Sequence, residues 1–330
     1  MKKRILISDI ARAMGVSITT VSFVLNGKAE EKRISEEVTN RILAYVEKVG
    51  YKPNQLAKSL RSGETKLLGL LVEDIGNPFF ANVAKHIEKE AYKNDYHIIY
   101  CSIANDDNRA KELIDLFYDR HIDGFIITPT DNLSPTVRML IQSKIPTILF
   151  DRYLTDVETN YVVSDNFKAA YDATKHLLEN KNHQKVGLVS LYSNQTQMRD
   201  RMEGYRKAID ESRLQNFIQK ISLDEDMSND IMHDFIVGNQ LDAVLFSTNY
   251  LTISALKSSK EKNFTMPKFI SFDEHTLFNL YEPSITSISQ NIKEIAHQLI
   301  KVLIKQISSK DEPIRQVVVP CELKIRASSL

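Results

Sequence analysis

Short runs of apolar residues alternate with stretches of helical spacing through most of this 330-residue chain, and this alternation restricts the fold more than any other feature. The apolar runs that we predict to be strands are residues 67–72, 97–101, 124–127, 147–150, 161–163, 186–189, 243–246, 268–272 and 317–319. Strands that alternate with helices are typical of doubly wound α/β folds with parallel sheets. The predicted strands are too many for one sheet, so we expect two α/β lobes with a ligand at the carboxyl ends of their strands.

The first 63 residues follow another pattern, in which short helices take the place of strands. Ser8 can cap a helix that runs to Met14, and Ser17 can cap a second helix over residues 18–25, because both hydroxyls can accept hydrogen bonds from first-turn amides. Gly15 suits the left-handed turn between the two helices. Two short helices joined by a tight turn that contains glycine form a helix-turn-helix pattern.

A third helix completes this head. It begins after Ser35 and ends at Gly50, and its apolar stripe is formed by Val38, Ile42, Val46 and Val49. Residues 1–66 contain 13 Lys or Arg and 7 Asp or Glu, although the whole chain has a net charge of zero. A basic head on an acidic body indicates a polyanionic partner. A three-helix bundle without a DNA role is the alternative, and the coincidence of basic charge with the turn spacing favours DNA binding.

The second helix is the one that enters the major groove in this arrangement, with its N-terminal side chains on the base edges. We expect base contacts from residues 18–20 and from Phe23 one turn later, while the short hydroxyls of Ser17 and Ser22 suit phosphates. The predicted DNA contacts of the head are Ser17, Ile18, Thr19, Thr20, Ser22, Phe23 and Asn26.

A basic segment follows the head. Pro53 interrupts the helical pattern, Asn54 can cap a new helix, and Gly63 can end it. A helix over residues 55–61 is too short to be stable alone in water, so it would become ordered only on DNA. An ordinary basic linker is the alternative, and the residues by themselves favour neither interpretation over the other.

The chain closely resembles the lactose-repressor (LacI/GalR) family in the segments SDIARAMGVSITTVSFVLNG, ISEEVTNRILAYVEKVGYKPNQLAKSLRSG and LLGLLVEDIGNPFFANV. The resemblance covers essentially the whole chain and implies a hinge helix at about 54–62, in which Leu60 is a wedge that enters the minor groove and kinks the duplex. The hinge contacts implied in this way are Lys58, Ser59, Leu60 and Arg61. Phe23 stands where the family usually has Arg, and it can make only apolar contacts such as one with a thymine methyl.

Polar residues follow the predicted strands of the body, among them Glu73, Thr128, Asp151, Arg152, Asp165, Ser190, Thr248, Asp273 and Glu274. Carboxylates, hydroxyls and arginines that meet in one cleft suit a polyhydroxylated ligand, because a sugar hydroxyl can donate to a carboxylate and accept from an arginine. Taken singly, Asp165 and Glu274 are better explained as helix caps, and Phe80 as a core residue.

The body also resembles the periplasmic sugar-binding-protein fold (type I) that this family shares. Through the motifs NPFF, LFDR, RMEGY, SFD and SISQ, the resemblance implies ligand contacts from Asn77, Phe79, Phe80, Asp151, Arg152, Arg201, Asp273 and Gln290. Thr248 belongs to the pair that replaces the family's usual Asn-Asp, and we include it as a further predicted contact.

We therefore expect a helix-turn-helix head at residues 1–63 and a two-lobe ligand-binding and dimerisation body at 64–330. The expected function is a ligand-responsive, sequence-specific transcription regulator, most simply a repressor of carbohydrate-utilisation genes with a sugar effector. It would bind palindromic double-stranded operator DNA as a homodimer. An activator or a corepressor-dependent regulator is the alternative, and the sequence does not give the sign of the response.

Other classes of protein fit the sequence less well. A solute-binding protein needs an export segment, and only three apolar residues, 5–7, follow the basic start of the chain. GxGxxG, P-loop, GxSxG and HxxxH motifs are missing, so we expect no catalytic residue, metal or cofactor. The apolar runs are too short to span a bilayer, and the distant Cys101 and Cys321 form no disulfide framework. These features favour a cytoplasmic protein that has no membrane contact.

Overall fold

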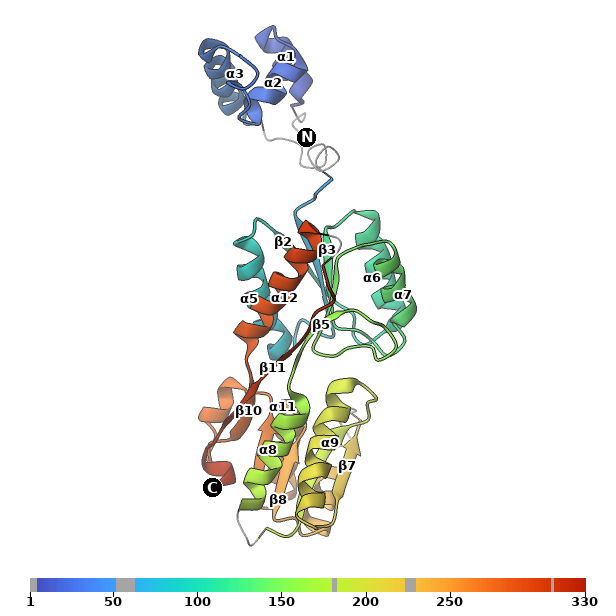
Figure 1. Cartoon of the computed structure of the whole chain (residues 1–330). Helices are drawn as coiled ribbons and strands as arrows, with labels where there is room; N and C mark the ends of the chain where they lie inside the picture. Colours follow the sequence, from blue (N-terminus) through green and yellow to red (C-terminus); the bar gives the residue numbers. More distant parts are fainter. Residues whose placement is uncertain (1–4, 52–62, 180–182, 223–229, 310–311) are drawn as a thin grey trace. The chain divides into compact units, whose positions relative to one another are not determined.

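The computed structural model of the chain describes residues 5–51, 63–179, 183–222, 230–309 and 312–330 (Figure 1). It divides into two units, Met1–Thr65 and Lys66–Leu330, which we call the head and the body. The predicted hinge helix at 54–62 lies outside the described residues. The predicted domain boundary at 63/64 therefore stays a prediction.

Three helices form the head: α1 (Ile7–Met14), α2 (Ile18–Leu25) and α3 (Glu36–Val49). The axis bends by 109° between α1 and α2, and Gly15 makes the turn with φ +68°, a conformation that suits glycine. The buried core between the helices is formed by Ile10, Ala11, Val21, Val24 and Ile42. The head is thus the predicted helix-turn-helix with a supporting third helix.

One of the two serine caps predicted for α1 and α2 is present and the other is not. The hydroxyl oxygen of Ser17 accepts from the Thr20 amide at 3.0 Å, as predicted. The prediction that Ser8 caps α1 is wrong, since α1 begins at Ile7 and Ser8 lies inside its first turn. There the Asp9 carboxylate accepts from the Leu6 amide at 3.0 Å, so an acidic side chain closes the turn instead.

The first lobe of the body is built on a sheet whose described strands are all parallel, in the order β11-β5-β4-β3-β1-β2. Its strands are β1 (Leu67–Val72), β2 (His97–Ser102), β3 (Gly124–Ile127), β4 (Thr147–Phe150), β5 (Asn160–Ser164) and β11 (Gln316–Val319). Two apolar cores cover the two faces of the sheet. The helices that bury them are α5 (Pro78–Tyr92) and α12 (Ile292–Ser308) on one face and α6 (Asp107–Asp119) and α7 (Ser134–Gln142) on the other.

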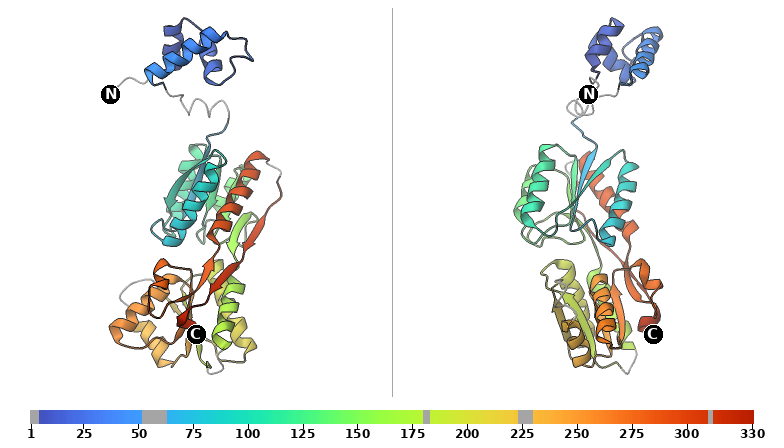
Figure 2. Two further views of the ribbon diagram at one scale, coloured as in Figure 1. Left: turned by 90° about the vertical axis from the view of Figure 1, so that its left-hand side faces the viewer. Right: turned by 180° about the vertical axis from the view of Figure 1, so that it is seen from behind.

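The second lobe repeats this plan with the order β12-β10-β9-β8-β6-β7. Figure 2 shows the ribbon of both lobes from two further sides. Its strands are β6 (Val186–Leu191), β7 (Phe217–Ile221), β8 (Ala243–Phe246), β9 (Lys268–Phe272), β10 (Thr286–Gln290) and β12 (Cys321–Lys324). Its helices are α8 (Asn166–Glu179) and α9 (Thr196–Glu211) on one face and the π-helix η1 (Asp234–Gly238), α11 (Asn249–Lys262) and the 3-10 helix η2 (Thr276–Asn279) on the other, with a last 3-10 helix η3 (Ala327–Ser329). The edge strand β12 runs antiparallel to β10.

The chain passes between the lobes three times, because β5 leads into α8, β10 leads into α12, and β11 leads into β12. Each lobe is therefore built from two separate segments of the chain, and α12 returns to the first lobe to pack beside α5 (Figure 1). The crossings bring the carboxyl ends of the two sheets to face each other. In α/β sheets this is the edge at which ligands bind.

All nine predicted strands are present, and the α/β fold with two lobes is confirmed. Three further strands, β7, β10 and β12, were not predicted. Strands β7 (FIQKI) and β12 (CELK) lie at sheet edges and are mostly half-buried, so they lack a continuous apolar run. Strand β10 (TSISQ) is mostly buried, but most of its residues are small and polar, so it contains no apolar run.

Helices α8 and α9 pack closely at Gly204. A Cβ atom at this position would overlap the carbonyl oxygen of Phe167 and would lie 2.9 Å from the amide nitrogen of Tyr171. We expect Gly204→Ala to lower the free energy of unfolding by about 1–3 kcal/mol, because backbone atoms cannot move aside as side-chain ends can. Urea unfolding measures this change. Gly238→Ala is the control, since a Cβ there meets nothing within 4 Å; equal losses in the two variants would contradict the packing argument.

Candidate ligand cavity and nucleic-acid interface

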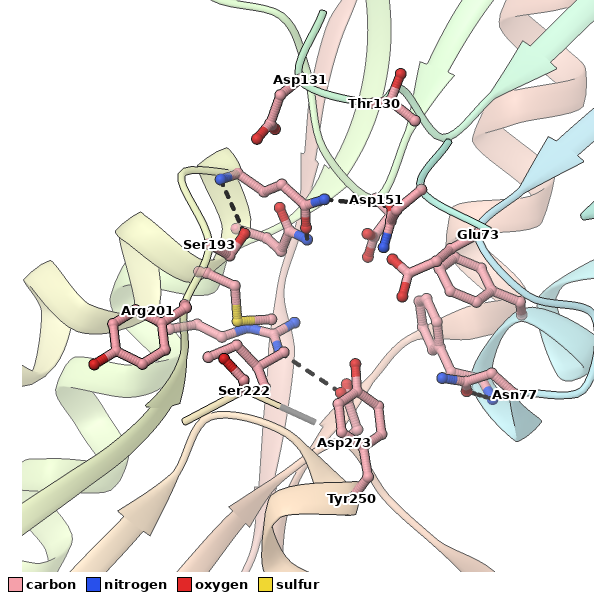
Figure 3. Close-up of a pocket in the computed structure, with 18 of the residues that line it drawn as sticks. Glu73, Asn77, Thr130, Asp131, Asp151, Ser193, Arg201, Ser222, Tyr250 and Asp273 are labelled. Carbon is pink, nitrogen blue, oxygen red and sulfur yellow. Dashed lines mark hydrogen bonds and ion pairs between the residues drawn. The ribbon is translucent and has the colours of Figure 1, made fainter. Parts of the chain in front are cut away.

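A cavity of about 480 Å³ lies in the body, at the facing carboxyl ends of the two sheets (Figure 3). Residues after the carboxyl ends of β1, β2, β3 and β4 line it from the first lobe, and residues at or after the carboxyl ends of β6, β7, β8, β9 and β10 line it from the second. Seven of the nine predicted ligand contacts are among the lining residues: Asn77, Phe79, Phe80, Asp151, Arg201, Asp273 and Gln290. Their contact with a ligand stays a prediction.

The first turn of α5 supplies an aromatic wall. Asn77 caps this helix, since its Oδ1 accepts from the Phe79 amide at 2.9 Å, and Pro78 takes the first helical position. The Phe79 ring stacks on Phe150 at 6.0 Å and meets Phe80 edge to face at 5.1 Å. Phe80 is only 4% exposed and belongs to the core, whereas Phe79 is partly buried. Phe79 is therefore the better placed of the two to lie against a ligand ring.

Two aspartates have the same unusual backbone. Asp151 follows β4 with φ +70°, and Asp273 follows β9 with φ +69°, a region that residues other than glycine seldom adopt. Such residues concentrate at functional sites. Burial raises the pKa of Asp151 to about 6, although Arg152 and Arg201 oppose this shift. The Asp151 carboxyl group is thus poorly solvated at the edge of the cavity.

Arg201, in α9, is held from several sides. Its Nε donates to Oδ1 of Asn166 at 2.9 Å, and its Nη1 donates to the Ser247 carbonyl at 2.6 Å. The guanidinium carbon lies 3.5 Å from the ring centroid of Phe272, and Nη1 lies 3.6 Å from Oδ2 of Asp273. The side chain is 2% exposed, so its position in the cavity wall is fixed before any ligand arrives.

Arg152 is used differently from the prediction. It does not line the cavity and is 2% exposed. Its Nε donates to the Pro129 carbonyl at 2.9 Å, and its Nη2 donates to Glu73 at 2.9 Å and to Asn105 at 2.8 Å. Its Nη1 donates to Oε1 of Gln195, which begins α9 in the second lobe. Protein acceptors therefore take up the guanidinium donors, and Arg152 joins the two lobes.

Thr248 also lies outside the cavity lining. It is fully buried and caps α11, since its Oγ1 accepts from the Leu251 amide at 3.3 Å. Of the two residues read as helix caps, Asp165 is confirmed by the hydrogen bond that its carboxylate accepts from the Lys168 amide at 3.1 Å. The prediction for Glu274 is wrong, because its carboxylate binds the Arg326 guanidinium at 2.9 Å instead.

Several lining residues were not predicted as contacts. They are Glu73, Asn105, Asp107, Thr130, Asp131, Asn132, Leu191, Tyr192, Ser193, Gln195, Gln197, Met198, Ile221, Ser222 and Tyr250. Glu73 directly follows β1, so its position at the end of a predicted strand could by itself have assigned it to the cavity lining. Asp107, Gln197 and Tyr250 lie in the first turns of helices that follow strands, a second signal that points to the same edge.

The predicted DNA contacts lie on the face of α2 that the core leaves free. Val21 and Val24 face the core, while Ile18 is 51% exposed and Phe23 is half-buried outside the core. The Phe23 ring has the ammonium of Lys32 5.6 Å from its centroid. Of the remaining predicted contacts, Ser17, Thr19 and Asn26 are exposed and Thr20 and Ser22 are half-buried. This arrangement leaves one face of α2 open to a groove, and contact with DNA stays a prediction.

The predicted hinge contacts Lys58, Ser59, Leu60 and Arg61 lie outside the described residues. Within the part of the chain that the structure describes, no group of His, Cys, Asp and Glu side chains could hold a metal ion. No single described helix is long and apolar enough to cross a membrane, and α1 and α2 reach that measure only as a pair bent by 109°.

Two family models match the chain. The model described as "Periplasmic binding proteins and sugar binding domain of LacI family" matches residues 65–327. The model described as "Bacterial regulatory proteins, lacI family" matches residues 6–54. Together they span the head and the body.

Individual relatives and solved structures agree with these two family models. The chain is 27% identical to the "HTH-type transcriptional repressor PurR" of Haemophilus influenzae strain PittEE, over 98% of each chain. Its fold is similar to the lac repressor dimer bound to operator and the anti-inducer ONPF, with a TM-score of 0.85, 17% identity, and 99% of this chain and 100% of the other covered. It is also similar to a LacI family regulator of Enterococcus faecium with bound ribose, with a TM-score of 0.71, 24% identity, and 79% and 98% covered.

The raised pKa of Asp151 generates a prediction about stability. Its pKa of about 6 in the folded protein lies above the usual value near 4, so ionisation disfavours the folded state. The free energy of unfolding should fall as pH rises from about 4 to about 6 and should lose no more to this group at higher pH. Asp151→Asn should therefore stabilise the ligand-free protein by up to about 3 kcal/mol at pH 8 and much less at pH 4.5.

Urea unfolding at the two pH values measures this difference. Asp95→Asn is the matched control, because Asp95 also has a positive φ of 61° but is exposed. A gain of stability that is the same at both pH values, or that Asp95→Asn reproduces, would show that ionisation of Asp151 is not its cause.

Proposed function

The chain belongs to the LacI family of bacterial regulatory proteins, and we propose that it is a cytoplasmic repressor that binds operator DNA as a homodimer and responds to a sugar. One observation supports this proposal above the others. A helix-turn-helix head precedes a body in which both lobes contribute polar and aromatic side chains to one cavity. The relatives named as transcriptional repressors favour repression, and the neighbour with bound ribose favours a sugar.

On the DNA, α2 would occupy the major groove with residues 18–20 and Phe23 toward the bases. The hinge contacts Lys58, Ser59 and Arg61 would neutralise phosphates, and Leu60 would enter the minor groove as a wedge. A dimer presents two such heads, so the operator would be a palindrome. These assignments follow from the family and from the free face of α2.

In the cavity, a sugar would meet groups of both lobes. The apolar face of its ring would lie against Phe79, and its hydroxyls would bind Asp151 on the first lobe and Arg201 and Asp273 on the second. Asn77 and Gln290 would add neutral hydrogen bonds. Because these contacts come from two lobes, the ligand favours the lobe arrangement in which all of them form at once.

The response to the ligand depends on its differential affinity for two states of the protein. An inducer would bind best to the arrangement that binds DNA poorly, and a corepressor to the arrangement that binds DNA well. The corepressor-dependent regulator is the alternative function. The two alternatives predict opposite changes in operator affinity when the ligand is added.

Selection from a random DNA library with the full-length protein gives the operator, and fluorescence anisotropy then measures its affinity with and without a panel of sugars. We expect one sugar to weaken operator binding, and strengthened binding would favour the alternative. Arg201→Ala should lower the sugar affinity by about tenfold to a hundredfold, because its partners in the cavity and on the ligand lose a charged donor. Operator binding in the absence of sugar should remain.

Arg199→Ala is the control, because this arginine is exposed in the same helix and does not line the cavity. Calorimetry should give wild-type sugar affinity for it. Full sugar affinity in Arg201→Ala, or an equal loss in both variants, would contradict the role given to Arg201.

Phe23 provides a test of the DNA contact. Phe23→Arg should shift the selected operator toward guanine at one symmetric position of each half-site, because arginine binds guanine through two hydrogen bonds worth about 1–3 kcal/mol. The control is Leu43→Arg, which adds the same charge at an exposed position of α3. If the wild type and Phe23→Arg select the same operator, Phe23 does not face the bases.

A further inference from the structure

The cavity contains more carboxylates than cations. Its lining includes the carboxylates of Glu73, Asp107, Asp131, Asp151 and Asp273. Among the described residues, Arg201 is the only lysine or arginine in the lining, and it lies 3.6 Å from Asp273. That one cation is therefore already balanced by a carboxylate of its own lobe.

Arg152, which lies behind the wall, does not correct this imbalance for a ligand. It is paired with Glu73 at 2.9 Å, and its other donors are directed to carbonyl and amide oxygens. Asp107, Asp131 and Asp151 are left without an ion-pair partner in the described part of the chain. The first lobe therefore presents three unbalanced carboxylates to the cavity.

The neutral groups nearby add further acceptors. Gln197 is 4% exposed, its Nε2 donates to Oε1 of Gln195 at 3.0 Å, and its own Oε1 has no hydrogen-bond partner among the described residues. The neighbouring Thr130 and Asn132, of which Asn132 donates to Oδ2 of Asp107 at 2.9 Å, lower the pKa of Asp107, so that carboxylate stays ionised at neutral pH. A ligand that satisfies this side of the cavity must bring hydrogen-bond donors.

Space does not decide between ligands here. A volume of about 480 Å³ corresponds to roughly sixteen water molecules at about 30 Å³ each, which exceeds the non-hydrogen atoms of a single hexose. A phosphate group on such a sugar would therefore fit. Its charge of about −1.5 to −2 would meet carboxylates without a free cation. Electrostatic repulsion would then have to exclude a phosphate ester that the cavity is large enough to hold.

We propose that the cavity selects its ligand by charge: it binds a neutral or amine-bearing polyhydroxylated compound and excludes the phosphate ester of the same compound. This inference rests on the proposed effector function. Hydroxyl or ammonium groups donate to the carboxylates and to Gln197, and they need no counter-cation from the protein. A phosphate would lose its hydration and be repelled by Asp107, Asp131 and Asp151, while Arg201, the one cation among the described lining residues, is already paired with Asp273.

Calorimetry on the full-length protein tests the proposal with two matched pairs, D-ribose with D-ribose 5-phosphate and D-glucose with D-glucose 6-phosphate, and with D-glucosamine as the amine-bearing compound. In the pair whose sugar binds, we expect the phosphate ester to bind at least a hundredfold more weakly. The difference should shrink as salt concentration rises, because salt screens the repulsion at the exposed mouth of the cavity. A purine base is included as a probe that could stack on Phe79 without needing the carboxylates.

The double variant Asp107→Asn with Asp131→Asn should narrow the gap between sugar and phosphate ester by about tenfold or more. The control is Glu112→Gln with Asp119→Asn, which removes two charges from exposed positions of α6 outside the cavity and should leave the gap unchanged. An unchanged gap in the cavity variant would overturn the proposal.

A phosphate ester that binds as tightly as its parent sugar would overturn the charge selection while leaving the sugar-effector function in place, and so would a purine base that binds more tightly than every sugar. A panel in which no compound alters operator affinity would instead contradict the proposed effector function itself. The operator measurement therefore separates failure of the function from failure of the inference.

Discussion

The hydrogen bonds of the buried Arg152 guanidinium are the interactions on which the cavity depends most. It binds the Pro129 carbonyl, Glu73 and Asn105 in its own lobe and Gln195 at the start of α9 in the other lobe. A buried charge is tolerated only where such partners surround it. The same interaction therefore holds the lobes together, orients Glu73 toward the cavity, and removes a cation from the groups that a ligand could use.

The two lobes share a loop pattern in which the residue after a strained aspartate carries opposite charge. In each, an aspartate with positive φ follows a strand, and a charged residue comes next: Asp151 before Arg152, and Asp273 before Glu274. Arg152 pairs with a carboxylate of its lobe at 2.9 Å, and Glu274 pairs with Arg326 at 2.9 Å. The second residue of each pair fixes the loop, so the strained aspartate before it is held in the cavity wall.

Much of this arrangement follows from the sequence, because apolar runs and strand ends are local features. The strands of both sheets' centres, the helix-turn-helix and the aspartates after β4 and β9 can all be predicted from residue order. What Arg152 and Thr248 do cannot be predicted in this way. A side chain after a strand can turn into the cavity or into the wall, and partners that are distant in sequence, such as Gln195 for Arg152, decide between the two. The edge strands β7 and β12 are missed for a related reason, since most of their residues are only half-buried and form no continuous apolar run.

The course of β1 limits how ligand binding can reach the head. Just before this strand, the Lys66 amide donates to Asp123 at 2.9 Å, and just after it Glu73 is bound to Arg152 at the cavity. Between these points, residues 68–72 are buried, and residues 68–71 are paired with β2 on one side and β3 on the other. A strand packed in this way does not stretch or bend enough to transmit a displacement along its length, since packed interiors have low compressibility. Movement of the lobes as rigid bodies is the route for a ligand signal that leaves β1 intact, and such a movement would break or shift the contact between Arg152 and Gln195.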